Sequence, residues 1–192
     1  MKSKIENIIR ESIAVKTALV SDSEMIRNME NASNWITEAI SRGGRIYFCG
    51  NGGSAADAQH LAAELSGRFY KDRPALAAEA LHCNSSYLTA VANDYSYEVI
   101  FQRMIAGFGK KEDILVGLST SGNSRNIVLA FEAARNQKMK TIGLTGIGGG
   151  KMKELSDILI CVPSGDTPRI QESHILIGHI ICQLVEEKLF LS

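Results

Sequence analysis

The stretch Ile46-Tyr47-Phe48-Cys49-Gly50-Asn51-Gly52-Gly53-Ser54 decides how this chain folds. Its four apolar residues predict a buried strand, and the glycine-rich segment after them predicts a turn into a helix. Glycines allow positive φ and a close approach of the backbone, and the free N–H groups at a helix N-terminus attract anions. A strand, a glycine-rich turn and a helix in this order are typical of a phosphate-binding site.

The helix predicted over 54–67 carries two ionisable side chains, His60 and Glu64. Because they are four residues apart, they share one face of the helix, about one turn from the loop. The pattern therefore predicts an ionisable pair beside an anion site.

The composition is that of an ordinary soluble protein. The 192 residues include 21 Lys and Arg and 21 Asp and Glu, so no overall field favours nucleic acid or an anionic membrane. The four cysteines are far apart and include no C-x-x-C pair, which favours reduced thiols over disulfides. Residues 1–20 contain no signal-peptide core, and the most apolar helix, 175–185, is too short to span a bilayer. We therefore expect a cytoplasmic protein with neither nucleic-acid nor membrane partners.

Strands and helices are expected to alternate along the chain. Apolar residues at helical spacing predict two N-terminal helices, over 3–20 and 25–40, before the strand at 45–49. The remaining elements are expected as helix 54–67, strand 76–81, helices from about 85 and over 97–108, strand 113–118, helix 125–137, strand 141–144, a short helix after 150, strand 158–162 and helix 168–189. This order predicts an α/β fold, a three-layer open parallel sheet of about five strands flanked by helices.

No internal repeat or linker divides the chain, so we expect one domain over 1–192. It consists of an N-terminal helical segment, 1–43, and an α/β core, 44–192. The last helix has apolar residues on nearly every side from Ile175 to Val185. Such a helix needs cover on several sides, which suggests a subunit interface.

A second loop follows the clearest buried strand. It contains four hydroxyl groups within six residues at the start of a helix: Ser119, Thr120, Ser121 and Ser124. A helix cap would use only one or two of them. Hydroxyls and helix N–H groups suit a phosphate monoester, and the lack of a nearby lysine favours a sugar phosphate over a nucleoside triphosphate with Mg²⁺.

Two nucleotide motifs fit incompletely. The segment 50–55 matches the dinucleotide fingerprint G-x-G-x-x-A, but the nearest acidic candidate, Asp72, has no apolar strand before it. The segment 148–151 resembles the end of a P-loop. However, Met152 replaces the required Ser or Thr, and Thr145 replaces the required first glycine. We interpret this second turn as structural.

Two polar residues are unusual in the apolar last helix, Gln171 and His179. Eight residues bring them about 80° past two full turns, so both can face one cleft. Together with His60 and Glu64 they form a mixed nitrogen and oxygen set that suits a divalent metal such as Zn²⁺. Gly178 would let another backbone come close. His82 and His174 are interpreted as structural or surface residues.

These motifs together resemble the sugar isomerase (SIS) domain family. The resemblance rests on the segment 50–65, Ala92-Asn93-Asp94, the loop 119–124, and Arg169–His174 followed by His179, and it covers nearly the whole chain. The chain is most similar to the phosphoheptose isomerases of that family. They convert D-sedoheptulose 7-phosphate to D-glycero-D-manno-heptose 7-phosphate, the first step of heptose synthesis for lipopolysaccharide core or capsule. The resemblance implies a flavodoxin-like fold and an aldose-ketose isomerase.

The resemblance also implies the residues of the site. Substrate contacts fall on Asn51, Gly52, Gly53, Glu64, Asn93, Asp94, Ser119, Thr120, Ser121, Ser124 and Gln171, and ligands of one Zn²⁺ per subunit fall on His60, Glu64, Gln171 and His179. Similar enzymes are homotetramers in which the N-terminal helices pack centrally and neighbouring subunits complete each site. Arg68 is a further candidate for a residue shared between subunits in this way. The segment Thr167-Pro168-Arg169-Ile170-Gln171 departs from the family pattern Ala-Asp-Arg-Ile-Gln. Pro168 cannot supply the carboxylate that the pattern has at this position.

Isomerisation needs a base near the α-carbon, an acid for the oxygens, and stabilisation of the enediolate. We expect Glu64 to transfer the carbon-bound proton through a cis-enediol and His179 to assist ring opening and oxygen protonation. Zn²⁺ and Gln171 would polarise the hydroxyl and carbonyl groups. Two alternatives stay open: an isomerase of another phosphosugar, and a non-catalytic SIS module such as the relative that associates with the replication initiator. A binding module needs no pair of Glu64 and His179, which favours the enzyme.

Overall fold

The structure is a computed structural model that describes residues 1–190. Its strands form one parallel sheet in the order β2-β1-β3-β4-β5. Their bounds are β1 Ile46–Cys49, β2 Ala78–Ala80, β3 Ile114–Ser119, β4 Lys140–Thr145 and β5 Ile158–Cys161. This is the strand order of flavodoxin-like sheets, in which ligands bind where the order reverses, between β1 and β3. The predicted fold class is confirmed.

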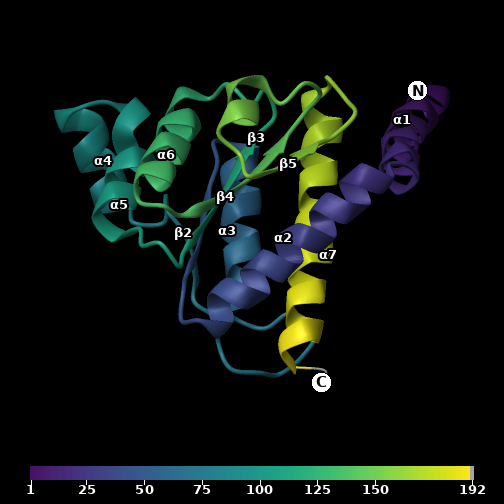
Figure 1. Cartoon of the computed structure of the whole chain (residues 1–192). Helices are drawn as coiled ribbons and strands as arrows, with labels where there is room; N and C mark the ends of the chain where they lie inside the picture. Colours follow the sequence, from purple (N-terminus) through teal and green to yellow (C-terminus); the bar gives the residue numbers. More distant parts are fainter. Residues whose placement is uncertain (191–192) are drawn as a thin grey trace.

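Helices cover both faces of the sheet, with α2, α3 and α7 on one side and α4, α5 and α6 on the other (Figure 1). Their bounds are α1 Lys2–Ser21, α2 Ser23–Ser41, α3 Gly53–Ser66, α4 Ser85–Asp94, α5 Ile100–Phe108, α6 Arg125–Asn136 and α7 Thr167–Phe190, with short 3₁₀ turns η1 Tyr97–Val99 and η2 Gly150–Glu154. Among residues 1–190, every helix is too short or too polar to cross a membrane.

Successive side chains of β1 point to opposite faces of the sheet and pack into two separate core layers. Ile46 and Phe48 pack toward α2, α3 and α7, whereas Tyr47 and Cys49 pack toward the helices on the other face. All four side chains are buried, as expected of a parallel strand covered on both faces. This packing places the end of β1, and the glycine-rich turn after it, at the rim of the sheet.

Most predicted elements agree with the structure to within one or two residues, and the differences have local causes. The helix predicted over 97–108 is divided into η1 and α5. The strand predicted from 113 begins at Ile114, because Asp113 N donates to Lys110 O at 2.9 Å in the preceding turn. Its carboxylate accepts from Arg45 N at 2.8 Å and Lys110 N at 2.9 Å. The strand near 76–81 contracts to three residues at the edge of the sheet.

The apolar surfaces of the first and last helices differ. Helix α7 packs against α1, α2, α3 and the sheet, so most of the cover that its sequence requires comes from within the chain. Helix α1 projects from the body (Figure 1) and leaves apolar side chains 42% to 56% exposed on one face: Ile5, Ile8, Ile9 and Ile13. The larger uncovered apolar face therefore lies on α1, while α7 keeps Ile180 36% exposed, and the expected subunit interface on the last helix stays a prediction.

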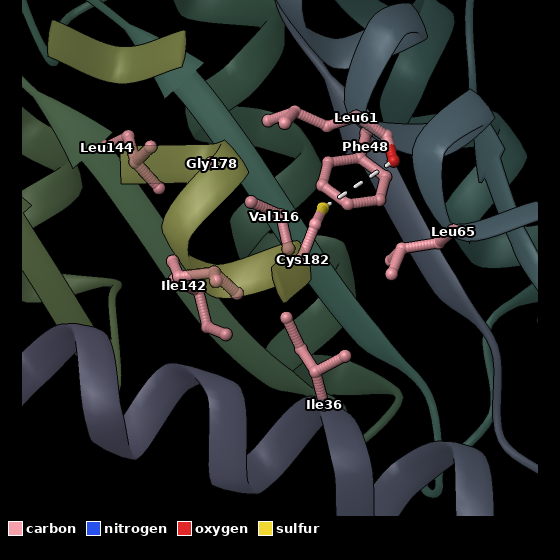
Figure 2. A pocket seen from close by; sticks show the side chains of 10 residues that line it. Ile36, Phe48, Leu61, Leu65, Val116, Ile142, Leu144, Gly178 and Cys182 are labelled. Atoms are coloured by element: carbon pink, nitrogen blue, oxygen red, sulfur yellow. Dashed lines mark hydrogen bonds between the residues drawn. The ribbon is translucent and has the colours of Figure 1, made fainter. Parts of the chain in front are cut away.

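A small apolar cavity lies where α3, α7 and α2 meet the sheet, as Figure 2 shows. Its volume is about 10 Å³, and its lining includes Phe48, Leu61, Gly178 and Cys182. A cavity this small and apolar holds at most one water molecule and is expected to stay dry. It is a packing feature beneath the contact between α3 and α7.

Candidate functional site

Two loops meet at the point where the strand order reverses. The turn Gly50–Gly52 follows β1 and the loop Thr120–Ser124 follows β3, and these strands pair directly. Asn51 Nδ2 donates to Asn126 Oδ1 at 2.9 Å, and Asn126 Nδ2 donates to Asn51 Oδ1 at 2.8 Å. The Tyr97 hydroxyl donates to Asn51 Oδ1 at 3.0 Å. The predicted sugar loop is thereby fixed to the helix that follows the predicted phosphate loop.

The serine loop gathers hydroxyl groups at the start of α6, and the hydroxyl of Ser121 accepts from Asn123 N at 3.1 Å. The hydroxyls of Ser119 and Ser124 lie 2.9 Å apart. Ser124 is the N-cap of α6, but its side chain makes no capping hydrogen bond, and the first N–H groups of a helix have no intrahelical partner. Thr120 is half-buried and Ser121 is exposed. Hydroxyl and N–H donors thus gather at one helix N-terminus, where an anion is favoured.

The glycine-rich turn at 146–150 supports this loop. Gly122 has φ +64°, and a Cβ there would lie 2.0 Å from Gly149 O. Met152 N donates to Gly122 O, and Lys151 N donates to Asn123 Oδ1, each at 3.0 Å. The turn packs against the serine loop, in agreement with its predicted structural role.

Helices α3 and α7 bring three ionisable side chains together. His60 Nε2 lies 2.9 Å from His179 Nε2 and 3.1 Å from Glu64 Oε1. The three ligand atoms all lie within 4.8 Å of one another. The helices approach closely because Gly178 has no side chain: a Cβ there would lie 2.4 Å from Leu61 Cδ1. The predicted close approach at Gly178 is confirmed.

The cluster lies partly open to solvent. The His60 side chain is 51% exposed and the Glu64 side chain 20%. Burial lowers the pKa of His179, and His60 lowers it further, while the carboxylate of Glu64 opposes this shift. On α3, burial raises the pKa of Asp57, while the nearby His60 lowers it. A neutral imidazole is the form of His179 that binds a metal.

Gln171 lies apart from this cluster in the structure. Its amide is next to Gly53, where a Cβ would lie 2.5 Å from Gln171 Nε2. Gln171 precedes His179 by eight residues, which is about 12 Å along a helix axis. The structure therefore places Gln171 against the sugar loop and forms the cluster of His60, Glu64 and His179 without it.

Known proteins share this fold and much of this sequence. A model of the SIS domain family matches residues 10–146. A phosphoheptose isomerase of Clostridium acetobutylicum is 48% identical over 190 residues, which are 99% of this chain and 97% of that protein. The chain belongs to the phosphoheptose isomerase family of SIS domain proteins. A relative of that name in Akkermansia muciniphila is 54% identical over 88% of this chain and 89% of its own. The solved phosphoheptose isomerase of Neisseria gonorrhoeae has a TM-score of 0.91 at 39% identity, over 97% of this chain and 98% of that one.

In this phosphoheptose isomerase family member, other predicted residues lie outside the cluster. Asn93 and Asp94 end α4, exposed, and Asn93 Nδ2 donates to Asp94 Oδ1 at 2.9 Å. Within residues 1–190, no hydrogen bond joins these two side chains to the rest of the site. Arg68 is exposed just after α3, and Pro168 is exposed in the first turn of α7. Their predicted roles stay predictions.

His174 is structural, as the sequence suggested. It is fully buried, and its Nε2 lies 3.1 Å from Thr145 O. Sequence reasoning missed Asn126 and Tyr97. The signal for Asn126 was a polar side chain among the apolar residues of α6, where it is 3% exposed. Nothing in the sequence marked Tyr97, since its role depends on the approach of η1 to the first loop.

Proposed function

We propose that this protein isomerises D-sedoheptulose 7-phosphate to D-glycero-D-manno-heptose 7-phosphate. The single observation that carries the proposal is the convergence of His60, Glu64 and His179, in a chain whose relatives bear the name phosphoheptose isomerase. We place the reaction in the cytoplasm, at the start of heptose supply for lipopolysaccharide core or capsule.

The loop 119–124 binds the phosphate of the substrate in this proposal. Its hydroxyl groups and the N-terminus of α6 supply donors without a metal-bound nucleotide. The turn at Asn51 to Gly53 and the amide of Gln171, which lies against Gly53, contact the sugar. Asn93 and Asp94 complete the sugar contacts from the end of α4.

Glu64 transfers the proton between carbons. Its Oε1 faces His60, whereas its Oε2 makes no hydrogen bond to any other described residue. Oε2 can therefore accept the proton from C1 of the ketose and return it to C2, through a cis-enediol. His179 delivers a proton to the carbonyl oxygen at C2 and removes the proton of the hydroxyl at C1. Ring opening uses the same imidazole.

The cluster fits a divalent metal ion. Two imidazole nitrogens and a carboxylate oxygen are ligands that Zn²⁺ takes in catalytic sites. Their separations of 2.9 and 3.1 Å are close to the roughly 3.3 Å between neighbouring ligands of a tetrahedral zinc ion. We infer that His60, Glu64 and His179 hold Zn²⁺, whereas Gln171, the fourth ligand that the family resemblance implies, lies against Gly53 on the sugar side. When bound, Zn²⁺ supplies a Lewis acid that polarises the substrate carbonyl.

The uncovered face of α1 supports a homo-oligomer. Four isoleucine side chains at helical spacing stay largely exposed on it, and a second copy of the chain would cover them. We propose the homotetramer implied by the family resemblance. Sedimentation or light scattering of the purified protein measures its mass directly.

The test is incubation of the purified protein with sedoheptulose 7-phosphate, with and without a chelator. We expect NMR to show the aldoheptose phosphate, its formation to stop with the chelator, and activity to return with added Zn²⁺. Fructose 6-phosphate in parallel tests the alternative of another phosphosugar. No turnover of either sugar phosphate in zinc-replete protein would favour a non-catalytic SIS module.

A further inference from the structure

A buried ion pair lies where the end of α3 meets α7. Arg73 Nε donates to Glu186 Oε2 at 3.0 Å, and the two side chains are only 2% and 3% exposed. Arg73 comes from the segment after α3, and Glu186 lies on α7 about two turns beyond His179. Neither residue belongs to the site described above. The pair joins the two helices that supply the ionisable cluster.

Arg73 caps the end of α3. Its Nη2 donates to Glu64 O at 2.8 Å, and its Nη1 donates to Leu65 O at 2.7 Å and Gly67 O at 3.0 Å. The carbonyls of a last helical turn have no intrahelical partner, and a cation is favourable at that end of a helix. One guanidinium group therefore holds the backbone of Glu64 itself.

Glu186 holds the segment that packs against His179. Its Oε1 accepts from Tyr70 N and Lys71 N, each at 3.0 Å. The preceding residue, Phe69, places its ring centroid 5.6 Å from that of His179. Both oxygens of Glu186 are thus occupied, one by Arg73 and one by backbone N–H groups. The carboxylate fixes an aromatic wall beside the imidazole.

We propose that Arg73 and Glu186 are positioning residues that hold Glu64 and His179 at the separation at which they share one metal ion. The proposal rests on the proposed function for what the cluster does. Both side chains are buried, so Arg73 acts through the α3 backbone and Glu186 through the segment at Phe69. Mutation of groups that orient metal ligands typically lowers metal affinity or activity by about 10- to 100-fold.

The test separates positioning from stability. Replacing both partners of a buried ion pair by apolar residues often preserves the fold, since no unpaired charge is left behind. The test variant is therefore Arg73→Met/Glu186→Leu. Its matched control is Arg42→Met/Glu38→Leu, which removes an exposed ion pair at the end of α2.

Four quantities are measured: Zn²⁺ affinity by chelator competition, kcat, KM, and the imidazole ¹⁵N resonances of the two site histidines in metal-free protein. We expect the test variant to fold, to bind Zn²⁺ about tenfold or more weakly, and to lose kcat to a similar degree. KM should stay near the wild-type value, because the phosphate loop lies on β3 and α6. Both imidazole resonances should shift in the test variant and stay unchanged in the control variant.

A folded test variant with wild-type Zn²⁺ affinity, kcat and imidazole resonances overturns the proposal and assigns the pair to stability alone. Arg73→Lys covers the case in which the test variant does not fold. Lysine keeps the charge opposite Glu186 but cannot reach the three carbonyls together, so we expect smaller losses of the same kind, and wild-type values overturn the proposal here too. If the wild-type protein lacks isomerase activity, the proposed function fails, while the Zn²⁺ and imidazole measurements still decide the positioning role.

Discussion

Asn51 and Asn126 exchange two amide hydrogen bonds, 2.9 and 2.8 Å long, across the point where the strand order of the sheet reverses. Asn126 Oδ1 also accepts from Ile127 N at 3.0 Å, so this amide is fixed to its own helix. The relationship means that the loop after β1 and the helix after the serine loop form one rigid surface. The sugar end and the phosphate end of a ligand are then held in a fixed relation.

Asn126→Asp tests this coupling. The substitution removes the N–H donor to Asn51 Oδ1 and places a negative charge beside the proposed phosphate loop. Asn51 Oδ1 keeps its hydrogen bond from the Tyr97 hydroxyl, so the lost bond costs about 0.5–1.5 kcal/mol. Because the new carboxylate also repels the phosphate, we expect KM for the sugar phosphate to rise about tenfold. Steady-state kinetics measure it, and Asn31→Asp on the exposed side of α2 is the control. An unchanged KM in Asn126→Asp would show that the two loops act independently.

Glu64→Gln tests the proposed base. Glutamine has the same size, and its amide oxygen can still face His60, but it cannot accept the proton from carbon. A general base contributes about 10²- to 10⁴-fold to the rate, so kcat is expected to fall within that range.

The measurement for Glu64→Gln is kcat together with the melting temperature. Glu30→Gln, an exposed residue of α2, should retain the activity of the wild-type protein. Near-normal isomerisation by a correctly folded Glu64→Gln protein would mean that another group is the base.

The sequence predicted the parts of the site that depend on local spacing. His60 and Glu64 lie four apart on one helix, and His179 stood out in an apolar helix, so their residue types alone pointed to one cluster. The contacts of Asn126 with Asn51 and of Arg73 with Glu186 join residues 75 and 113 positions apart. No local pattern encodes such pairs, because they depend on how whole elements pack.

Gln171 shows the limit of helical periodicity. The angular spacing predicted that Gln171 and His179 lie on related faces of one helix. It does not give their separation along the helix axis. The eight-residue rise of about 12 Å brings Gln171 to Gly53 instead of to His60. The same reasoning explains why Asn93 and Asp94 were placed by resemblance alone: the end of a helix such as α4 has no fixed position until its neighbours pack.

Gly178→Ala tests the close contact of α3 and α7. A Cβ at this position would lie 2.4 Å from the buried side chain of Leu61, and the adjacent cavity of about 10 Å³ leaves that side chain little room to move. Overpacking of this kind costs about 1–3 kcal/mol. Because the helices must separate, Zn²⁺ affinity is expected to fall as well.

Chemical denaturation and chelator competition measure the two effects of Gly178→Ala. The control is Gly107→Ala in α5, where an added Cβ meets nothing within 4 Å. This control should be neutral or stabilising, because alanine favours helix. Equal stability and Zn²⁺ affinity in Gly178→Ala and the wild-type protein would contradict a tight helix contact.

His174→Gln tests the dependence of stability on pH. Burial lowers the pKa of His174 to about 4, opposed by its hydrogen bond to Thr145 O, whereas an unfolded histidine titrates near 6.5. Between these values the unfolded chain binds the proton and the folded chain does not. Stability is therefore lost as the pH falls from 6.5 toward 4, by about 3 kcal/mol from this residue.

Glutamine keeps an N–H donor for Thr145 O but does not titrate, so His174→Gln should lack this contribution. The free energies of unfolding of both proteins are compared by urea denaturation at pH 7, 5.5 and 4.5, since acid effects of the carboxylates are common to both and cancel in the difference. We expect the variant to gain stability relative to the wild-type protein as the pH falls. A constant difference across this range would show that His174 is protonated with the same pKa in the folded and unfolded chains.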